Sequence, residues 1–152
     1  MPDRTRGYAH RIDVQAPQEQ LWRALIEPER VAEWYAPGAR IAARPGGSYW
    51  IRADRDLERE AHLDVFLPPQ RLRLLYMPER GMPVVDSVIV DDFILDSAGD
   101  GSVLRLLGSG IPDGPDWEPF YLRMREGWAR ALQRLKVVTE KRVRAATAGS
   151  TP

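Results

Sequence analysis

Two adjacent carboxylates, Asp91 and Asp92, lie in an otherwise apolar segment over residues 86–95. Successive side chains of a strand point to opposite faces, so one of the two must face the side on which apolar residues are buried. A carboxylate enclosed by apolar groups has a raised pKa and could act as an acid or base. Asp91, together with Tyr76 and Arg52, is therefore the candidate catalytic group that could handle a proton or an enolate.

An ion pair is the more frequent state of such a carboxylate. Arg52, Arg73 and Arg105 lie in neighbouring predicted strands and could each pair with one of the two aspartates. Catalysis is therefore the minority interpretation of this pair, and we expect a binding protein more than an enzyme.

Histidine and cysteine chemistry is sparse. The chain has no cysteine and two histidines, His10 and His62, without HxxxH or HExxH spacing. Disulfides, thiolate sites and a histidine metal site are therefore not expected, and we expect no metal and no cofactor. His62 shares a strand face with Glu60 and Asp64 and should be exposed, whereas His10 should be partly buried.

The elements that must position these residues begin with a strand. Apolar and polar residues alternate from Tyr8 to Val14, which is typical of a strand. Leu21, Trp22, Leu25 and Ile26 then repeat at helical spacing. We expect two short helices, over Pro17–Ile26 and Glu29–Trp34.

A meander of antiparallel strands follows, because period-two segments alternate with turn signals. The strands are expected at Arg40–Ala43, Ser48–Ala53, Arg59–Phe66, Arg71–Met77, Asp86–Leu95 and Ser102–Leu107. Gly99-Asp100-Gly101 is a hairpin candidate, and Gly108-Ser109-Gly110 is interpreted as a turn.

The last element is a long helix with one apolar stripe. Its apolar residues recur at three and four positions: Trp117, Phe120, Tyr121, Met124, Trp128, Ala131, Leu132, Leu135 and Val138. Gly127 costs this helix about 1 kcal/mol relative to alanine. We expect close packing on the sheet beside Trp128 to compensate, and the alternative is that Gly127 makes room for a ligand. The chain is predicted to be one α+β domain, residues 1–144, with a flexible tail over 145–152.

Composition narrows the partners. The 152 residues carry 22 basic and 22 acidic side chains, interleaved along the chain, so no basic face for nucleic acid is expected. No apolar run approaches the roughly 20 residues that span a bilayer, and no signal peptide is visible, so we expect no membrane span and a cytoplasmic protein.

Several segments resemble the START-like (SRPBCC) superfamily. The segment Ala16–Leu25 is similar to the motif "ApxexVWxAL", and residues 27–34 are similar to "dPexlxxW". Residues 44–49 resemble "xpGGxf", residues 108–112 resemble the link before the last helix, and Gly127-Trp128 begins a "GWxxxLxxL" signature. The resemblance covers nearly the whole chain and points to the largely bacterial branch named after the activator of a heat-shock chaperone's ATPase.

This resemblance implies a helix-grip fold, in which a curved antiparallel sheet of six or seven strands wraps around the long C-terminal helix. Side chains between helix and sheet would then line a cavity. Residues from these segments would form its ligand-binding wall: Trp34, Tyr35, Tyr49, Tyr76, Phe93, Trp117, Phe120, Tyr121 and Met124. Tyrosine and tryptophan combine an apolar body with a polar group, which suits an apolar or aromatic ligand. The alternative is that most of them are plain core.

Three functions fit these features. We favour a protein that binds a small apolar or aromatic molecule, because aromatic residues are dense and a catalytic set is lacking. The alternatives are a metal-free polyketide cyclase or aromatase, which the superfamily contains, and an interaction module. The interaction module would be a homodimer or a chaperone partner. Val103 and Leu107 face away from Leu104 and Leu106 in the last strand, so one of these apolar pairs would lie on the outer sheet surface and favour association.

Overall fold

The structure, a computed structural model, describes residues 4–55, 57–78 and 87–149. It confirms the α+β class. Its strands are β1 (Thr5–Val14), β2 (Gly38–Ile41), β3 (Ser48–Arg52), β4 (Glu58–Leu67), β5 (Arg71–Tyr76), β6 (Val90–Ala98) and β7 (Gly101–Pro112). Its α-helices are α1 (Gln18–Ile26), α2 (Pro28–Trp34) and α3 (Glu118–Gly149), and a 3₁₀ helix, Pro115–Trp117, precedes α3.

The seven strands form one antiparallel sheet in the order β1-β7-β6-β5-β4-β3-β2. Consecutive strands from β2 to β7 are neighbours, as expected of a meander, and β1 joins the far edge beside β7. The two edge strands therefore differ: β2 has four residues, whereas β1 has ten.

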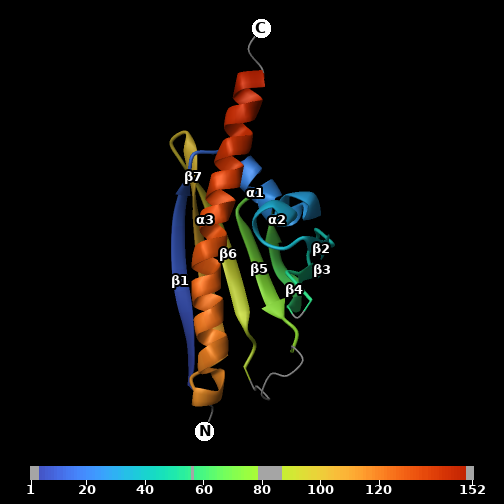
Figure 1. Cartoon of the computed structure of the whole chain (residues 1–152), viewed down its shortest axis with the longest axis vertical. Coiled ribbons are helices and arrows are strands. Elements are labelled where there is room, and N and C mark those ends of the chain that lie inside the picture. Colours follow the sequence, from blue (N-terminus) through green and yellow to red (C-terminus); the bar gives the residue numbers. More distant parts are fainter. Residues whose placement is uncertain (1–3, 56, 79–86, 150–152) are drawn as a thin grey trace.

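The helices lie on one face of this sheet (Figure 1), which gives the helix-grip arrangement. The helix α3 packs against β1 and against the two short helices, and its last turns extend beyond the strands (Figure 1). Among the strands, β1 makes the most extensive contact with α3. No helix among the described residues is long and apolar enough to cross a membrane.

Two sequence-based boundaries differ from the structure. Gly108-Ser109-Gly110 is not a turn but lies within the second half of β7, whose ladder with β6 and β1 continues through Gly108. The prediction of a turn was wrong because Gly108 does not reverse the chain. It allows the Tyr8 ring to pack closely on the strand. Residues 145–149, expected to begin the tail, continue α3.

The outer face of the sheet carries ion pairs. Asp92 and Asp64 accept hydrogen bonds from Arg71 and Arg73 respectively, across neighbouring strands. Of the two apolar pairs in β7, Leu104 and Leu106 are buried. Val103 is buried as well, and only Leu107 is exposed, at 43%. A single exposed leucine is ordinary for a protein surface.

Candidate functional site

A buried carboxylate, Asp91 of β6, lies at the centre of the inner face. It has no exposed surface. Its Oδ1 accepts a hydrogen bond from the Tyr8 hydroxyl, and its Oδ2 accepts one from the Tyr76 hydroxyl at 2.6 Å and one from Trp128 Nε1 at 3.1 Å. Strands β1, β5 and β6 and helix α3 thus meet at one side chain. We call Asp91, Tyr8, Tyr76 and Trp128 the carboxylate cluster.

The register of the sheet explains how Tyr8 reaches Asp91 across an intervening strand. Tyr8 of β1 is the partner of Gly108 in β7, and Gly108 is in turn the partner of Asp91 in β6. A Cβ atom at Gly108 would lie 2.3 Å from the Tyr8 ring. Because Gly108 has no side chain, the ring can lie over its backbone and bring the hydroxyl to the carboxylate.

A buried arginine accompanies the cluster. Arg59 of β4 is only 2% exposed, and its guanidinium carbon lies 3.8 Å from the centre of the Tyr76 ring. Burial raises the pKa of Asp91 above its ordinary value, although the Arg59 charge and the three hydrogen bonds act in the opposite direction. Burial likewise raises the pKa of Tyr8 and of Tyr76, so both hydroxyls keep their protons.

The carboxylate cluster can support a site more readily than it can catalyse. Both oxygens of Asp91 already accept hydrogen bonds from the protein, and a substrate would have to displace one of these donors. A fully bonded buried network fixes its members in place. We therefore interpret it as the rigid floor beneath the space under α3.

That space is a cavity of about 190 Å³ between the middle of α3 and the β3–β4 side of the sheet. Its lining residues come from α3, β4, the β3–β4 connection and the residue after α2: Tyr35, Ala53, Leu57, Arg59, Arg123, Met124, Gly127, Trp128, Arg130, Ala131 and Arg134. Trp128 belongs both to this lining and to the carboxylate cluster, so the two features share a wall.

Gly127 opens the cavity, which corrects the expectation of close packing. A Cβ atom built at this position would have no atom within 4 Å. The sequence cost of a glycine inside α3 is therefore not compensated by a tight crossing over the sheet. Instead, the missing side chain leaves space at the cavity wall.

Part of the predicted aromatic wall does gather beside the cavity. Trp34 stacks on Tyr35 with ring centres 5.2 Å apart, and Tyr35 lies 4.8 Å from Trp128. Phe93 meets Trp128 edge-on at 5.5 Å. Met124 lines the cavity directly, and Tyr76 joins through the carboxylate cluster.

The remaining predicted wall residues lie elsewhere. The Tyr49 hydroxyl donates to Leu25 O at 2.7 Å. Trp117 and Phe120 pack edge-to-face on each other, and the Tyr121 hydroxyl donates to Gly7 O at 2.9 Å. These four aromatic side chains do not line the cavity, and their buried parts are core.

Arg52 does not reach Asp91. Tyr49 and Ile51 of β3 are buried, so alternation turns Arg52 outward, where it donates to Glu58 at 3.1 Å. The arginine near Asp91 is Arg59, which the sequence analysis missed. Its parity offered a signal, because Arg59 shares a strand face with the buried Ala61 and Leu63.

Tyr8 and Trp128 were also missed as site residues. Tyr8 was placed on the same face as Ile12 and Val14, and Trp128 within the apolar stripe, but neither pattern shows which polar group lies opposite. His10 is partly buried as expected, 5.6 Å from the Tyr8 ring, and burial lowers its pKa. His62 is exposed, as predicted.

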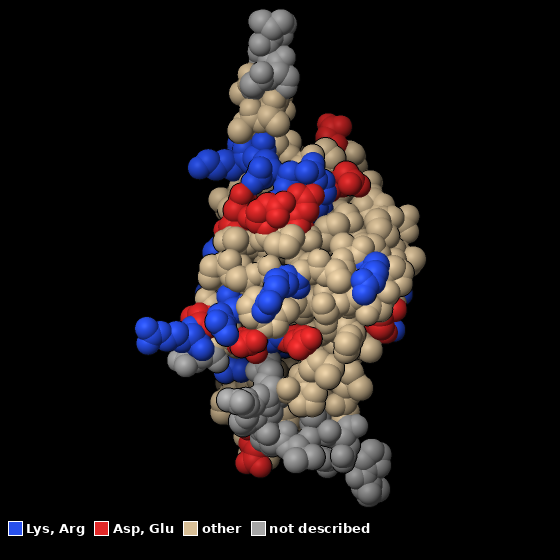
Figure 2. Space-filling view, turned by 90° about the vertical axis from the view of Figure 1, so that its right-hand side faces the viewer, with Lys and Arg blue, Asp and Glu red and all other residues tan. Residues whose placement is uncertain are grey.

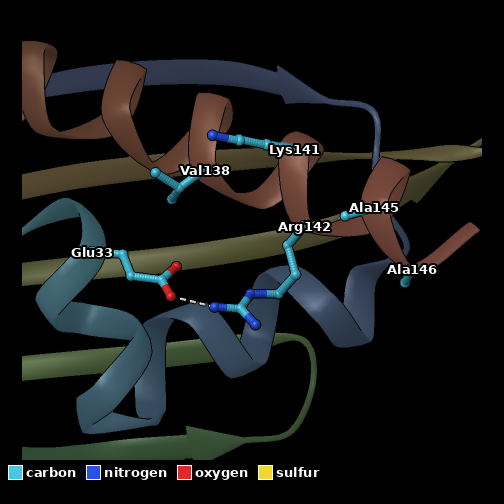
Figure 3. A pocket seen from close by; sticks show the side chains of 6 residues that line it. All are labelled: Glu33, Val138, Lys141, Arg142, Ala145 and Ala146. Atoms are coloured by element: carbon cyan, nitrogen blue, oxygen red, sulfur yellow. Dashed lines mark hydrogen bonds and ion pairs between the residues drawn. The ribbon is translucent and has the colours of Figure 1, made fainter. Parts of the chain in front are cut away.

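A second hollow of about 650 Å³ lies outside the helix–sheet interface (Figure 3). It is bounded by α2 and the C-terminal turns of α3, and the Arg142 guanidinium pairs with Glu33 within it (Figure 3). Its lining is open and rich in alanine and charged side chains, and it is a surface depression rather than an enclosed site.

On the face of the molecule drawn in Figure 2, acidic and basic side chains lie side by side around a broad uncharged area.

The sequence profile of the family described as "Activator of Hsp90 ATPase homolog 1-like protein" matches residues 15–140. No curated protein matches the chain. Protein MLL2253 from Mesorhizobium loti is 24% identical, with a TM-score of 0.79 over 90% of this chain and 98% of that one.

Two further solved structures have the same fold. The Aha1 dimer from Colwellia psychrerythraea is 19% identical, with a TM-score of 0.77 over 89% of this chain and 96% of that one. CalU16 from Micromonospora echinospora is 22% identical, with a TM-score of 0.71 over 93% and 80%. These matches agree with the architecture and with the motifs in the sequence.

Proposed function

This chain belongs to the Activator of Hsp90 ATPase homolog 1-like family, and we propose that it binds a small apolar or aromatic molecule in the cavity between α3 and the sheet. One observation carries the proposal: Gly127 and the aromatic side chains of Tyr35 and Trp128 border a cavity that the core leaves open.

The cavity volume limits the ligand. Ligand pockets commonly measure about 300–1,000 Å³, whereas an apolar cavity of about 150 Å³ can hold benzene. At about 190 Å³, this cavity accommodates one or two small rings without rearrangement. The proposed ligand is therefore small, and a larger one would require α3 or the β3–β4 connection to move.

A matched pair of leucine substitutions tests the proposal. Gly127→Leu places a side chain in the open space and removes a helix glycine, so it should abolish ligand binding while leaving the protein as stable as the wild type or more stable. Ala129→Leu, at an exposed position of α3 outside the lining, is the control and should bind normally.

The measurement is thermal stabilisation by a library of small aromatic and aliphatic compounds, followed by calorimetry of the hits. Hits that bind the wild type and Ala129→Leu but not Gly127→Leu would support the cavity as the site. If no compound binds the wild type, or if Gly127→Leu binds as well as the control, the proposal fails.

A cyclase- or aromatase-like activity is a second candidate, favoured by the buried Asp91 with its raised pKa and its bond from Tyr76. A carboxylic acid whose pKa lies above its ordinary value could transfer a proton to an enolate. Turnover of a poly-β-ketone surrogate that is lost in Asp91→Asn and Tyr76→Phe would favour the enzyme. Binding of the surrogate without turnover would favour the carrier.

Self-association is the interaction proposed for the surface. The Colwellia protein is a dimer, and the ten-residue edge strand β1 and the exposed Leu107 are two features of this chain that such a contact could use. Light scattering over a range of concentrations tests the proposal, and a constant monomer mass at the highest concentration would reject it.

A further inference from the structure

We infer that the ligand of this cavity carries a negative charge, most simply as an aromatic carboxylate. The inference rests on the proposed function and adds the chemical class of the ligand. Four of the eleven described residues that line the cavity are arginines, namely Arg59, Arg123, Arg130 and Arg134, and none is acidic.

Three of these arginines share one face of α3. Arg123, Gly127, Arg130 and Arg134 are spaced by four, three and four residues, so they follow one stripe along the helix. The stripe places positive groups on both sides of the gap that Gly127 opens. Like charges four residues apart, such as Arg130 and Arg134, destabilise a helix slightly, and a bound anion would relieve that repulsion.

Of the four arginines, Arg59 lies deepest, near the buried Asp91, whereas Arg130 and Arg134 are at exposed positions of α3. The Arg59 charge opposes the rise that burial causes in the pKa of Asp91, so this cation already has a counterpart on the floor of the site. Glu126, on the same stretch of α3, does not line the cavity. The three arginines of α3 therefore leave an excess of positive charge among the described lining residues.

The ligand's orientation follows from this distribution. Its ring would lie against Tyr35, Met124 and Trp128, and its carboxylate would face the α3 stripe. Guanidinium groups suit this partner, because their planar donors match the two oxygens of a carboxylate. Arg134 also donates to Trp34 O at 2.9 Å, which holds it beside the aromatic wall.

Two compounds of nearly the same shape test the inference: 1-naphthoate and its neutral analogue 1-naphthamide. Calorimetry with the whole chain should show naphthoate binding at least about tenfold more tightly at low salt, the gain expected from one charge-assisted hydrogen bond. The preference should shrink as salt is added, because the α3 arginines are exposed to solvent.

Arg130→Gln is the informative variant, because Arg130 has neither the backbone bond of Arg134 nor the buried position of Arg59. It should weaken naphthoate binding about tenfold and leave naphthamide binding unchanged. Arg144→Gln removes the same charge from an exposed position of α3 outside the cavity lining and should change neither. A variant that failed to fold would lose both ligands together.

The outcomes distinguish failure of the anionic-ligand inference from failure of the proposed binding function. Equal binding of naphthoate and naphthamide, or an unchanged preference in Arg130→Gln, overturns the anionic ligand and leaves the binding cavity intact. Failure of naphthoate to bind while the library yields only neutral ligands that depend on Gly127 has the same meaning. Failure of every compound, charged or neutral, overturns the proposed function itself.

Discussion

Asp91 and Asp92 are neighbours in β6, but the two faces of the sheet surround them differently. The inner face encloses Asp91 among Tyr8, Tyr76 and Trp128, whereas the outer face leaves Asp92 half-buried beside the Arg71 guanidinium. Because Asp92 is partly exposed, water can replace Arg71 as its partner, whereas Asp91 has no exposed surface. The same side chain is therefore structural on one face and replaceable on the other.

The largest effect should come from removing the inner carboxylate. Asp91→Ala leaves three buried donors without an acceptor and the nearby Arg59 charge without its anion, which should cost about 3–5 kcal/mol of the free energy of unfolding. Asp92→Ala is the matched control and should cost much less. Urea unfolding of both variants measures the contrast, and equal losses would contradict it.

Gly108→Ala should give the next largest effect. Its added methyl group would displace the Tyr8 ring from β7 and break the hydrogen bond to Asp91, at a cost of about 1–3 kcal/mol. In a Tyr8→Leu background the same substitution should cost less, because no ring remains to be displaced. A double-mutant cycle by urea unfolding tests this coupling, and additive losses would show that Gly108 acts independently of Tyr8.

Asp91→Asn tests the charge of the inner group through the pH dependence of stability. The folded pKa of Asp91 lies above its ordinary value of 3.8, so the folded protein binds this proton more tightly than the unfolded chain does. The stability that Asp91 contributes is then fully present at pH values below 3.8 and declines as the pH rises through the folded pKa. The wild type should lose stability relative to Asp91→Asn over that range, and a rising or constant difference would contradict the raised pKa.

The contrast between the two aspartates also shows where sequence analysis stops. The apolar periodicity predicted the α+β class, the order of the elements and the long helix, because each depends on residues close together in sequence. Period-two alternation required one aspartate to face inward but could not say which one. Phe93 and Leu95 share a face with Asp91, and Val90 and Ile94 share a face with Asp92, so both faces of β6 look apolar.

The candidate site was predictable only in part, for the same reason. Arg52 was named and Arg59 was missed, because the choice of an arginine depends on which face of its strand α3 covers. Gly127 was expected to mark a close crossing, since a helix glycine indicates either contact or space. The position of α3, which packs mainly against β1, leaves space rather than a close contact at Gly127.

The position of β1 has a consequence for how this domain folds. Its only strand neighbour in the described sheet is β7, and the pairs Tyr8–Gly108 and Ile12–Leu104 join residues about a hundred positions apart in the chain. Loops of that length close slowly, and folding rates fall as the separation of contacting residues grows. During synthesis β1 therefore cannot pair with β7 until nearly the whole meander has left the ribosome. Until then, the sheet leaves the backbone hydrogen-bonding groups of β1 without their strand partners.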